Sequence, residues 1–221
     1  MPRIARVVAV EYPHHITQKG NYQQAVFDSE EDYIQYLQWL KDYCHKYSLK
    51  IWAYCLMSNH VHFIGVPMKN YSLSRTLNTL HMRYSQYFNQ KKKVKGHLWQ
   101  GRFYSCVLDE RHLYAAIRYV ENNPVRAGIV EKPYEYKWSS ARGHIYKDAD
   151  PVLSNDCYLI NEIDNWFSYL MEKEEETITN DIRRNTKTGR PCGDDIFIKA
   201  IEGFFNRRLR ALPKGRPLKR K

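Results

Sequence analysis

The sequence lacks the long apolar runs and paired-cysteine motifs that mark several large protein classes. No apolar stretch approaches the roughly 18 residues that cross a bilayer, and the first residues lack the hydrophobic core of a signal peptide. The five cysteines form no C-x-x-C pair and are odd in number. A disulfide framework or a zinc finger is therefore not expected, and we expect a cytoplasmic protein without membrane contact.

Acidic side chains are scarce at both ends of the chain, which carries a net charge of +11. Residues 1–130 contain 17 Lys and Arg against 9 Asp and Glu, residues 131–182 contain 5 against 12, and residues 183–221 contain 13 against 3. Basic blocks with interleaved aromatic residues favour nucleic-acid binding. The alternative is a solvated surface with a solubilising tail. A further hypothesis is that the acidic segment pairs with the basic tail and competes with DNA.

Hydrophobic spacing, caps and breakers predict an alternation of strands and helices up to residue 122. Strands are expected within residues 4–20 and over 49–56, 60–66 and 103–108. Helices are expected after the caps Ser29, Ser72 and Asp109, the last over residues 110–122. The resulting order is a ferredoxin-like split β-α-β arrangement with one extra helix. We therefore predict an α+β fold with an antiparallel sheet.

Beyond residue 130 the pattern weakens. Amphipathic helices are expected over residues 157–175 and 194–210, and Pro133 to Ser140 is expected to be a loop. We predict three regions: a domain that carries the chemistry (1–145), an acidic helical linker (146–182) and a helical, basic DNA-binding tail (183–221).

Two histidines lie two residues apart in the strand expected over residues 60–66. Successive side chains of a strand alternate between faces, so His60 and His62 project from one side. A single H-x-H pair is a weak signal, because strand histidines are often hydrogen-bonded core or surface residues. The apolar flanks strengthen the signal, and imidazole binds several divalent metals.

The last expected helix carries a second set of candidate residues, and Pro124 must end it. Tyr119 and Asn123 are four residues apart, a spacing that puts two side chains on one helical face. The phenol of Tyr119 is a candidate nucleophile for a phosphodiester, and the amide oxygen of Asn123 a candidate third metal ligand. Tyr114 is the rival tyrosine, but Arg118 occupies the position four residues after it.

These segments resemble the motifs of a known family. The string His60-Val61-His62 is similar to the HUH motif, in which a bulky apolar residue separates two histidines. The string from Arg118 to Gly128, RYVENNPVRAG, resembles the signature of the REP-associated tyrosine transposases, which are single-tyrosine relatives of small insertion-sequence transposases. Two further stretches are similar to that family: Trp99-Gln100-Gly101-Arg102-Phe103, and Arg83-Tyr84 through Phe88-Asn89. The similarity covers roughly residues 10–145.

The resemblance implies an HUH domain that cuts and rejoins single-stranded DNA. It implies that Tyr119 attacks phosphorus and becomes linked to the 5′ phosphate, releasing a 3′ hydroxyl, while His60, His62 and Asn123 hold Mg²⁺ or Mn²⁺. The implied substrate is a repetitive extragenic palindrome folded as a hairpin. The resemblance favours a monomer, although related insertion-sequence enzymes are homodimers that share tyrosine helices.

Basic and aromatic residues spread over the chain are predicted to contact this DNA. The lysines of residues 91–96 are candidates for phosphate contacts, or else form a solvated loop. Four aromatic residues are candidates for base stacking, with core packing as the alternative: Trp99, Phe103, Tyr84 and Tyr87. The two Gly-Arg-Pro arginines are candidates for a minor groove, or else belong to a disordered tail. The predicted DNA-contact residues are Arg83, Lys91, Lys92, Lys93, Lys95, Trp99, Arg102, Arg118, Arg126, Arg190 and Arg216.

Three functions remain open on the sequence alone. The first is the metal-dependent tyrosine transposase, and the second is a non-enzymatic regulator that binds DNA hairpins. The third is a metallohydrolase that uses activated water.

Overall fold

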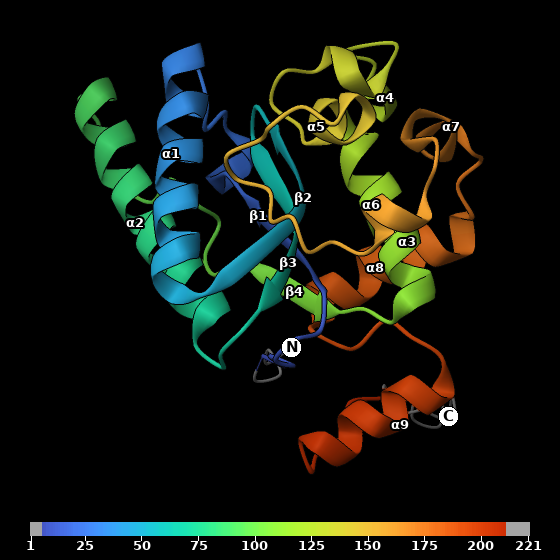
Figure 1. Ribbon diagram of the computed structural model, residues 1–221. Coiled ribbons are helices and arrows are strands. Elements are labelled where there is room, and N and C mark those ends of the chain that lie inside the picture. Colours follow the sequence, from blue (N-terminus) through green and yellow to red (C-terminus); the bar gives the residue numbers. More distant parts are fainter. Residues whose placement is uncertain (1–5, 211–221) are drawn as a thin grey trace, which may run out of the picture.

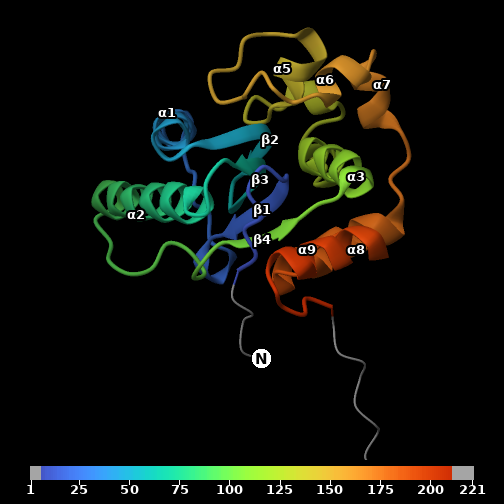
Figure 2. The same ribbon diagram turned by 60° about the horizontal axis from the view of Figure 1, so that its bottom comes forward.

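A four-stranded antiparallel sheet with the strand order β2-β3-β1-β4 organises the computed structural model, which describes residues 6–210. Its strands are β1 (His14–Lys19), β2 (Leu49–Met57), β3 (His60–Pro67) and β4 (Tyr104–Val107). Helices α1 (Glu30–Tyr47) and α2 (Ser72–Lys92) cover one face of the sheet, while α3 (Glu110–Glu121) and α8 (Glu176–Thr188) cover the other (Figures 1 and 2). The predicted α+β, ferredoxin-like order of elements is confirmed.

Local side-chain caps explain where the long helices begin. The carboxylate of Asp32 accepts the backbone N–H of Ser29 at 3.1 Å, and Asp109 Oδ1 accepts the N–H of His112 at 2.8 Å. The prediction that Ser72 caps α2 is wrong, because Tyr71 is the N-cap. The Ser72 hydroxyl instead donates to the Ser48 carbonyl at 2.8 Å, which ties α2 to the end of α1.

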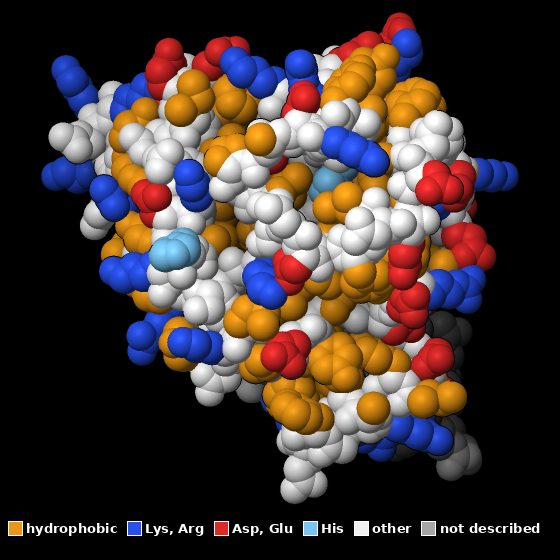
Figure 3. All heavy atoms as spheres, in the orientation of Figure 1, with side chains coloured by type: hydrophobic (Ala, Val, Ile, Leu, Met, Phe, Trp, Pro, Cys, Tyr) orange, Lys and Arg blue, Asp and Glu red, His pale blue; other side chains and the backbone are white. Residues whose placement is uncertain are grey.

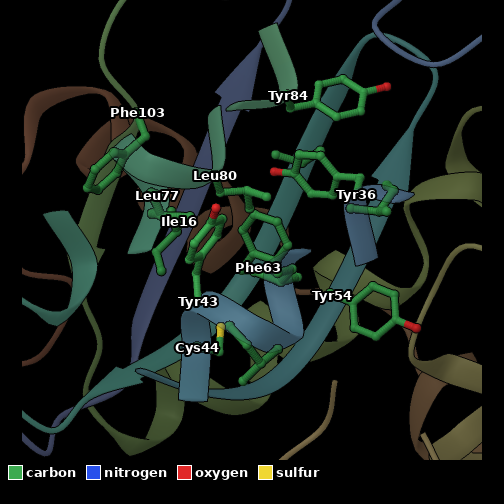
Figure 4. Packing of buried hydrophobic residues seen from close by; sticks show 14 of the residues in the cluster. Ile16, Tyr36, Tyr43, Cys44, Tyr54, Phe63, Leu77, Leu80, Tyr84 and Phe103 are labelled. Carbon is green, nitrogen blue, oxygen red and sulfur yellow. The ribbon is translucent and has the colours of Figure 1, made fainter. Parts of the chain in front are cut away.

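The alternation of side chains along the strands builds a separate core on each face of the sheet. Ile16, Val61 and Phe63 point into the core beneath α1 and α2, where Phe63 packs beside Tyr36 and Leu80 (Figure 4). The residues that alternate with them along the strands point the other way. Ile64 of β3 and Cys106 of β4, for example, pack beneath α3 and α8. His62 follows the same alternation and therefore lies on the face that α3 covers.

The chain beyond α3 is a series of short elements, and the prediction of one helix over residues 157–175 is wrong. Asn165 ends the preceding turn and caps a new helix, its Oδ1 accepting the N–H of Ser168 at 2.9 Å. The helix predicted over 194–210 is shorter, ending at Phe204. The remaining elements are η1 (Asn21–Gln23), α4 (Asn123–Arg126), η2 (Pro133–Glu135), α5 (Ala141–Tyr146), α6 (Leu159–Glu162), α7 (Trp166–Met171) and α9 (Asp195–Phe204).

The predicted region boundaries do not coincide with the ends of elements. Residues 145 and 146 both lie in α5, and residues 182 and 183 both lie in α8. The first part of the predicted tail packs on the sheet, where Cys192 forms a parallel bridge with Leu108. Within residues 6–210, no helix is both long and apolar enough to cross a membrane.

His14 and His81 are core histidines whose surroundings favour the neutral ring. His14 Nδ1 donates to the Tyr12 carbonyl at 2.7 Å, and its Nε2 accepts the N–H of Ala9 at 3.3 Å, so a second proton would break the Ala9 bond. Burial lowers the pKa of His14 from 6.5 to about 4, and burial lowers that of His81 to about 3. These histidines serve the core rather than a metal.

We predict that acid destabilises the fold through these histidines. A histidine whose pKa is lowered on folding binds a proton first in the unfolded chain. Stability is therefore complete above pH 6.5 and is lost as the pH falls toward the folded pKa of about 4. His14 alone should cost up to about 3 kcal/mol across that window. Urea titrations between pH 7 and 4 measure the slope. His14→Asn should flatten it, whereas His45→Asn, an exposed control on α1, should not; an unchanged slope in His14→Asn contradicts the assignment.

Candidate active site

The pairing of β1 with β3 places the two histidines of the H-x-H pair on one face of the sheet. Thr17 lies opposite His62 and Lys19 lies opposite His60 in the antiparallel register. The two imidazole rings are 5.0 Å apart between centroids and nearly perpendicular. The strand alternation therefore brings both rings together at the start of β3, as the sequence predicts.

His60 is fixed in one tautomer by its neighbour. Its Nδ1 lies 2.6 Å from Asn59 Oδ1, while Asn59 Nδ2 donates to the Gln23 carbonyl at 3.3 Å. Because an amide oxygen only accepts, His60 carries its proton on Nδ1 and leaves a lone pair on Nε2. Burial and the charge of Lys19 lower the pKa of His60 to about 4, so the ring is neutral at physiological pH.

His62 is more deeply buried and is paired with a third histidine. Its Nδ1 lies 2.9 Å from Nε2 of His15, and the two rings stack at 5.1 Å. Burial first, and then the neighbouring His15, His60 and Arg126, lower the pKa of His62 well below 6.5. His62 is therefore also neutral and suited to ligate a cation.

Tyr119 stands beside this histidine group, on the inner face of α3. Its ring is edge-on to both His62 and His15, at centroid distances of 5.7 and 5.8 Å. The guanidinium of Arg126 lies 4.0 Å from the ring centre, and Nε of Arg183 lies 3.5 Å from the hydroxyl. Tyr119 is thus placed between two imidazoles and two guanidinium groups.

Arg183 and His15 were not among the candidates from the sequence. Arg183 comes from α8, and β1 supplies His15, so both reach the site only through tertiary packing. The pair His14-His15 was visible in the sequence. No local signal, however, distinguishes the structural His14 from the site residue His15, because that difference depends on which face of β1 each occupies.

Asn123 lies next to the site, but its amide oxygen is already bonded. The helix breaks at Asn122, and Asn123 begins α4 instead of continuing α3. Arg126 Nη2 donates both to the Tyr119 carbonyl at 2.8 Å and to Asn123 Oδ1 at 3.0 Å. A guanidinium beside that oxygen opposes a cation there. The amide NH₂ of Asn123 is buried without a partner, so the third metal ligand is not assembled and stays a prediction.

Tyr114, the rival tyrosine, is directed elsewhere. Its hydroxyl donates to the carboxylate of Glu162 on α6. That hydrogen bond, together with burial, raises the pKa of Tyr114 to about 12, which opposes ionisation. The structure thus favours Tyr119 over Tyr114 as the nucleophile.

Glu121 of the same motif is a structural residue. Its carboxylate is fully buried and accepts from Ser140 Oγ at 2.5 Å, His144 Nδ1 at 2.6 Å and Trp166 Nε1 at 2.7 Å. Ser140 precedes α5, His144 lies within α5, and Trp166 is the first residue of α7. Glu121 therefore anchors the end of α3, and with it Tyr119, to the C-terminal elements.

The acidic segment pairs with arginines of α3 and α4, and also with the start of the predicted tail, where Asp181 pairs with Arg184 at 2.8 Å within α8. The hypothesis that it pairs with the basic tail and competes with DNA stays a prediction. Arg111 pairs with Glu175 at 2.8 Å, Arg126 with Glu174 at 2.7 Å, and Arg118 with Glu172. Figure 3 shows acidic side chains gathered along the edge formed by α6 and α7, and Lys and Arg along the edge formed by α1 and α2. The segment follows α3 because α3 presents its arginines on the face away from the sheet.

Several predicted DNA contacts are instead committed to the fold. Trp99 is 7% exposed and donates Nε1 to the His81 carbonyl at 3.1 Å, so its prediction as a stacking platform is wrong. Lys91 pairs with buried Asp32 at 2.6 Å and Lys92 with Asp28 at 2.6 Å. Of the other aromatic candidates, Tyr84 and Phe103 are also buried in the core beneath α2, whereas the half-buried Tyr87 donates its hydroxyl to Asp32 Oδ1 at 3.0 Å.

The remaining predicted contacts differ in how accessible they are. Lys93 and Lys95 are exposed, and Arg102 lines a basic pocket with Arg6 and Lys187 between β4 and the end of α8. Arg83 donates to the Tyr43 hydroxyl at 2.9 Å, and Arg118 to the Tyr169 carbonyl at 2.7 Å. Nε of Arg190 is buried without a partner. Arg216 lies outside the described residues.

The donor set fits a divalent cation in part. Both His60 and His62 are neutral, and Nε2 of neither forms a hydrogen bond within the described chain. In the same residues, no group of three His, Cys, Asp or Glu side chains is arranged to hold a metal. The two imidazoles therefore fit, and further ligands must come from an amide, water or the substrate.

Comparison with known proteins gives the family. The family described as transposase, IS200-like, matches residues 9–123, which include the histidine pair, Tyr119 and Asn123. The chain belongs to the IS200-like transposase family. The resemblance found in the sequence is thereby confirmed at the level of the family, and transposase activity follows from it. No curated protein matches the sequence.

Two solved structures extend the comparison. One is a REP-associated tyrosine transposase bound to a REP hairpin, with a TM-score of 0.54 and 16% identity, covering 71% of this chain and 93% of that one. At this identity it shows the shared fold. A putative transposase from Deinococcus radiodurans gives a TM-score of 0.39 at 16% identity, covering 55% of this chain and 97% of that one.

We predict that Glu121→Ala destabilises the protein by about 3 to 5 kcal/mol, because it leaves the buried N–H groups of His144 and Trp166 unpaired. Glu172→Ala is the control: that carboxylate is largely exposed and its loss should cost less than about 1 kcal/mol, although it also pairs with an arginine. Denaturant titrations at pH 7 compare the two. Equal losses would show that Glu121 is not the anchor of α3.

Proposed function

We propose that this transposase cuts single-stranded DNA beside a hairpin and rejoins the ends through a tyrosine-linked intermediate. The observation that carries the proposal is the contact of Tyr119 with His62, whose ring lies 5.0 Å from that of His60, although the two segments are about 60 residues apart. A phenol near two neutral imidazoles and two guanidinium groups has the components for transfer of a phosphodiester. The hairpin substrate is proposed because the structurally similar REP-associated transposase binds one.

The chemical step exchanges one phosphodiester for another. The oxygen of Tyr119 attacks phosphorus and forms a bond to the 5′ phosphate, while the bond from phosphorus to the 3′ oxygen breaks. The phenol proton passes to solvent, and the departing 3′ oxygen takes up a proton to become a hydroxyl. The number of phosphoester bonds is unchanged, so the 3′ hydroxyl of another strand end can reverse the step without a nucleoside triphosphate.

His60 and His62 are the residues that would hold Mg²⁺ or Mn²⁺ through their Nε2 atoms. Bound there, the cation would polarise the scissile phosphate as a Lewis acid and template its position. The lowered pKa values of the two histidines keep both rings unprotonated and available. Asn123 joins them only if its amide leaves Arg126.

The two arginines beside Tyr119 have separate roles in the proposal. Arg126 is held by Glu174 and by the Tyr119 carbonyl, so it orients the tyrosine from a fixed position. Arg183 is exposed and reaches the hydroxyl itself, where its charge would stabilise the negative charge that develops on the phosphate during transfer. Its place at the surface leaves it accessible to the DNA backbone.

DNA would approach over the exposed basic groups near the site. Lys19 lies across from His60, and the pocket lined by Arg6, Arg102 and Lys187 lies along β4. Lys93 and Lys95 extend the positive surface beyond α2. Because Tyr119 and both histidines of a single chain meet, a monomer contains the whole group; a homodimer that exchanges tyrosine helices is not required by the geometry.

We predict that Tyr119→Phe lowers covalent adduct formation by about a thousandfold or more and leaves DNA binding intact. The assay incubates protein with Mn²⁺ and a hairpin oligonucleotide that has single-stranded flanks. DNA labelled at its 3′ end should give labelled protein, and DNA labelled at its 5′ end should give a shorter free strand. Tyr114→Phe is the matched control on the same helix and should retain the adduct.

Each alternative function predicts a different result in that assay. A hydrolase that uses water would cut DNA without labelling the protein and would tolerate Tyr119→Phe. A hairpin-binding regulator would retain binding and cut nothing with any variant. Either result contradicts the proposal.

A further inference from the structure

We infer that Thr186 and His15 are positioning residues that hold His62 in the tautomer whose Nε2 is free for a metal. The inference rests on the proposed function and assigns a role to α8, which lies outside residues 9–123 that match the family. It rests on a continuous chain of buried hydrogen bonds that runs from α8 through β1 to β3.

This series of hydrogen bonds contains three short contacts. Thr186 Oγ1 lies 2.7 Å from the Ile182 carbonyl within α8. The same oxygen lies 2.7 Å from Nδ1 of His15, and Nε2 of His15 lies 2.9 Å from Nδ1 of His62. Thr186 is 2% exposed and His15 is 1% exposed, so water does not compete for these groups.

The carbonyl of Ile182 determines which atom donates in each of these hydrogen bonds. A carbonyl only accepts, and a hydroxyl has a single proton. Thr186 therefore donates to Ile182 at 2.7 Å and accepts from Nδ1–H of His15, while the Cys106 thiol, 3.2 Å from the same oxygen, is the weaker partner. With its ring proton on Nδ1, His15 leaves Nε2 bare, and this nitrogen accepts Nδ1–H of His62. The remaining nitrogen of His62, Nε2, is left with its lone pair.

The opposite direction is less favourable and would block the metal. If Thr186 donated to His15, the bond to Ile182 would be lost, and two hydrogen bonds would replace three. His62 would then accept at Nδ1 and carry its proton on Nε2. Each buried hydrogen bond contributes about 1 kcal/mol, which favours the first arrangement.

His60 is held in the same tautomer by a separate hydrogen bond, from its Nδ1 to Asn59. Its proton is held on Nδ1 by Asn59, whose amide is oriented by the Gln23 carbonyl. Two different sets of partners therefore leave Nε2 bare on both histidines. Metal-ligating histidines commonly donate their other ring N–H to such a partner, which fixes the tautomer and ring orientation.

The test combines tautomer and metal affinity in three variants of the full chain. Thr186→Val removes the hydroxyl at nearly constant volume, and Thr186→Ser retains it. Thr188→Val is the matched control, because Thr188 makes the same kind of bond, to the Arg184 carbonyl at 3.2 Å, at the partly exposed end of α8. Thermal melts establish that each variant is folded.

Nitrogen-15 NMR of the metal-free protein should show the proton of His62 on Nδ1 in the wild type. Its signals are assigned by comparison with His62→Asn. In Thr186→Val the proton should shift toward Nε2, and Mn²⁺ affinity measured by electron paramagnetic resonance should fall about 10- to 100-fold. Thr186→Ser should restore both readouts, and Thr188→Val should change neither.

The outcomes separate this inference from the proposed function. A wild-type His62 protonated on Nε2, or a Thr186→Val protein that binds Mn²⁺ as tightly as wild type, overturns the inference. If the wild type forms no tyrosine adduct, while Thr186→Val still shifts the tautomer and weakens Mn²⁺ binding, the proposed function fails and the inference stands.

Discussion

The register of β1 against β3 is the constraint on which the site depends. With Thr17 opposite His62 and Lys19 opposite His60, His15 comes within hydrogen-bonding distance of His62. A slip of one residue would turn one strand over and send its histidines toward the opposite core. The register is held by apolar residues such as Ile16 and Phe63, which are fully buried beneath α1 and α2. Packing on one face thus determines the chemistry on the other.

The motif that ends α3 serves two sides of the molecule at once. Tyr119 faces the histidines, whereas Glu121, two residues later, is bonded to groups before α5, within α5 and at the start of α7. Where α3 ends before Pro124, the side chain of Arg126 from α4 donates to the Tyr119 carbonyl. The position of Tyr119 is therefore set by the C-terminal elements as well as by the sheet, and α8 adds Arg183 to its surroundings.

The parts of the fold that depend on local sequence could be predicted, and those that depend on packing could not. The strand and helix order followed from periodicity, and Asp109 marked the start of α3. The face of β3 that carries His60 and His62 followed from strand alternation. In contrast, burial of Trp99 and the bond between Asn123 and Arg126 depend on contacts between elements. The capping signal of Asn165 was present in the sequence, but a continuous amphipathic pattern concealed it.

The central claim is that His60 and His62 hold a divalent cation beside Tyr119. The most direct test is a crystal of the protein with Mn²⁺ and a hairpin oligonucleotide, with diffraction collected at the manganese edge. We expect one anomalous peak about 2.0 to 2.2 Å from Nε2 of both histidines, with a DNA phosphate between the peak and the tyrosine hydroxyl. A peak bound elsewhere, with both imidazoles unligated, would contradict the account.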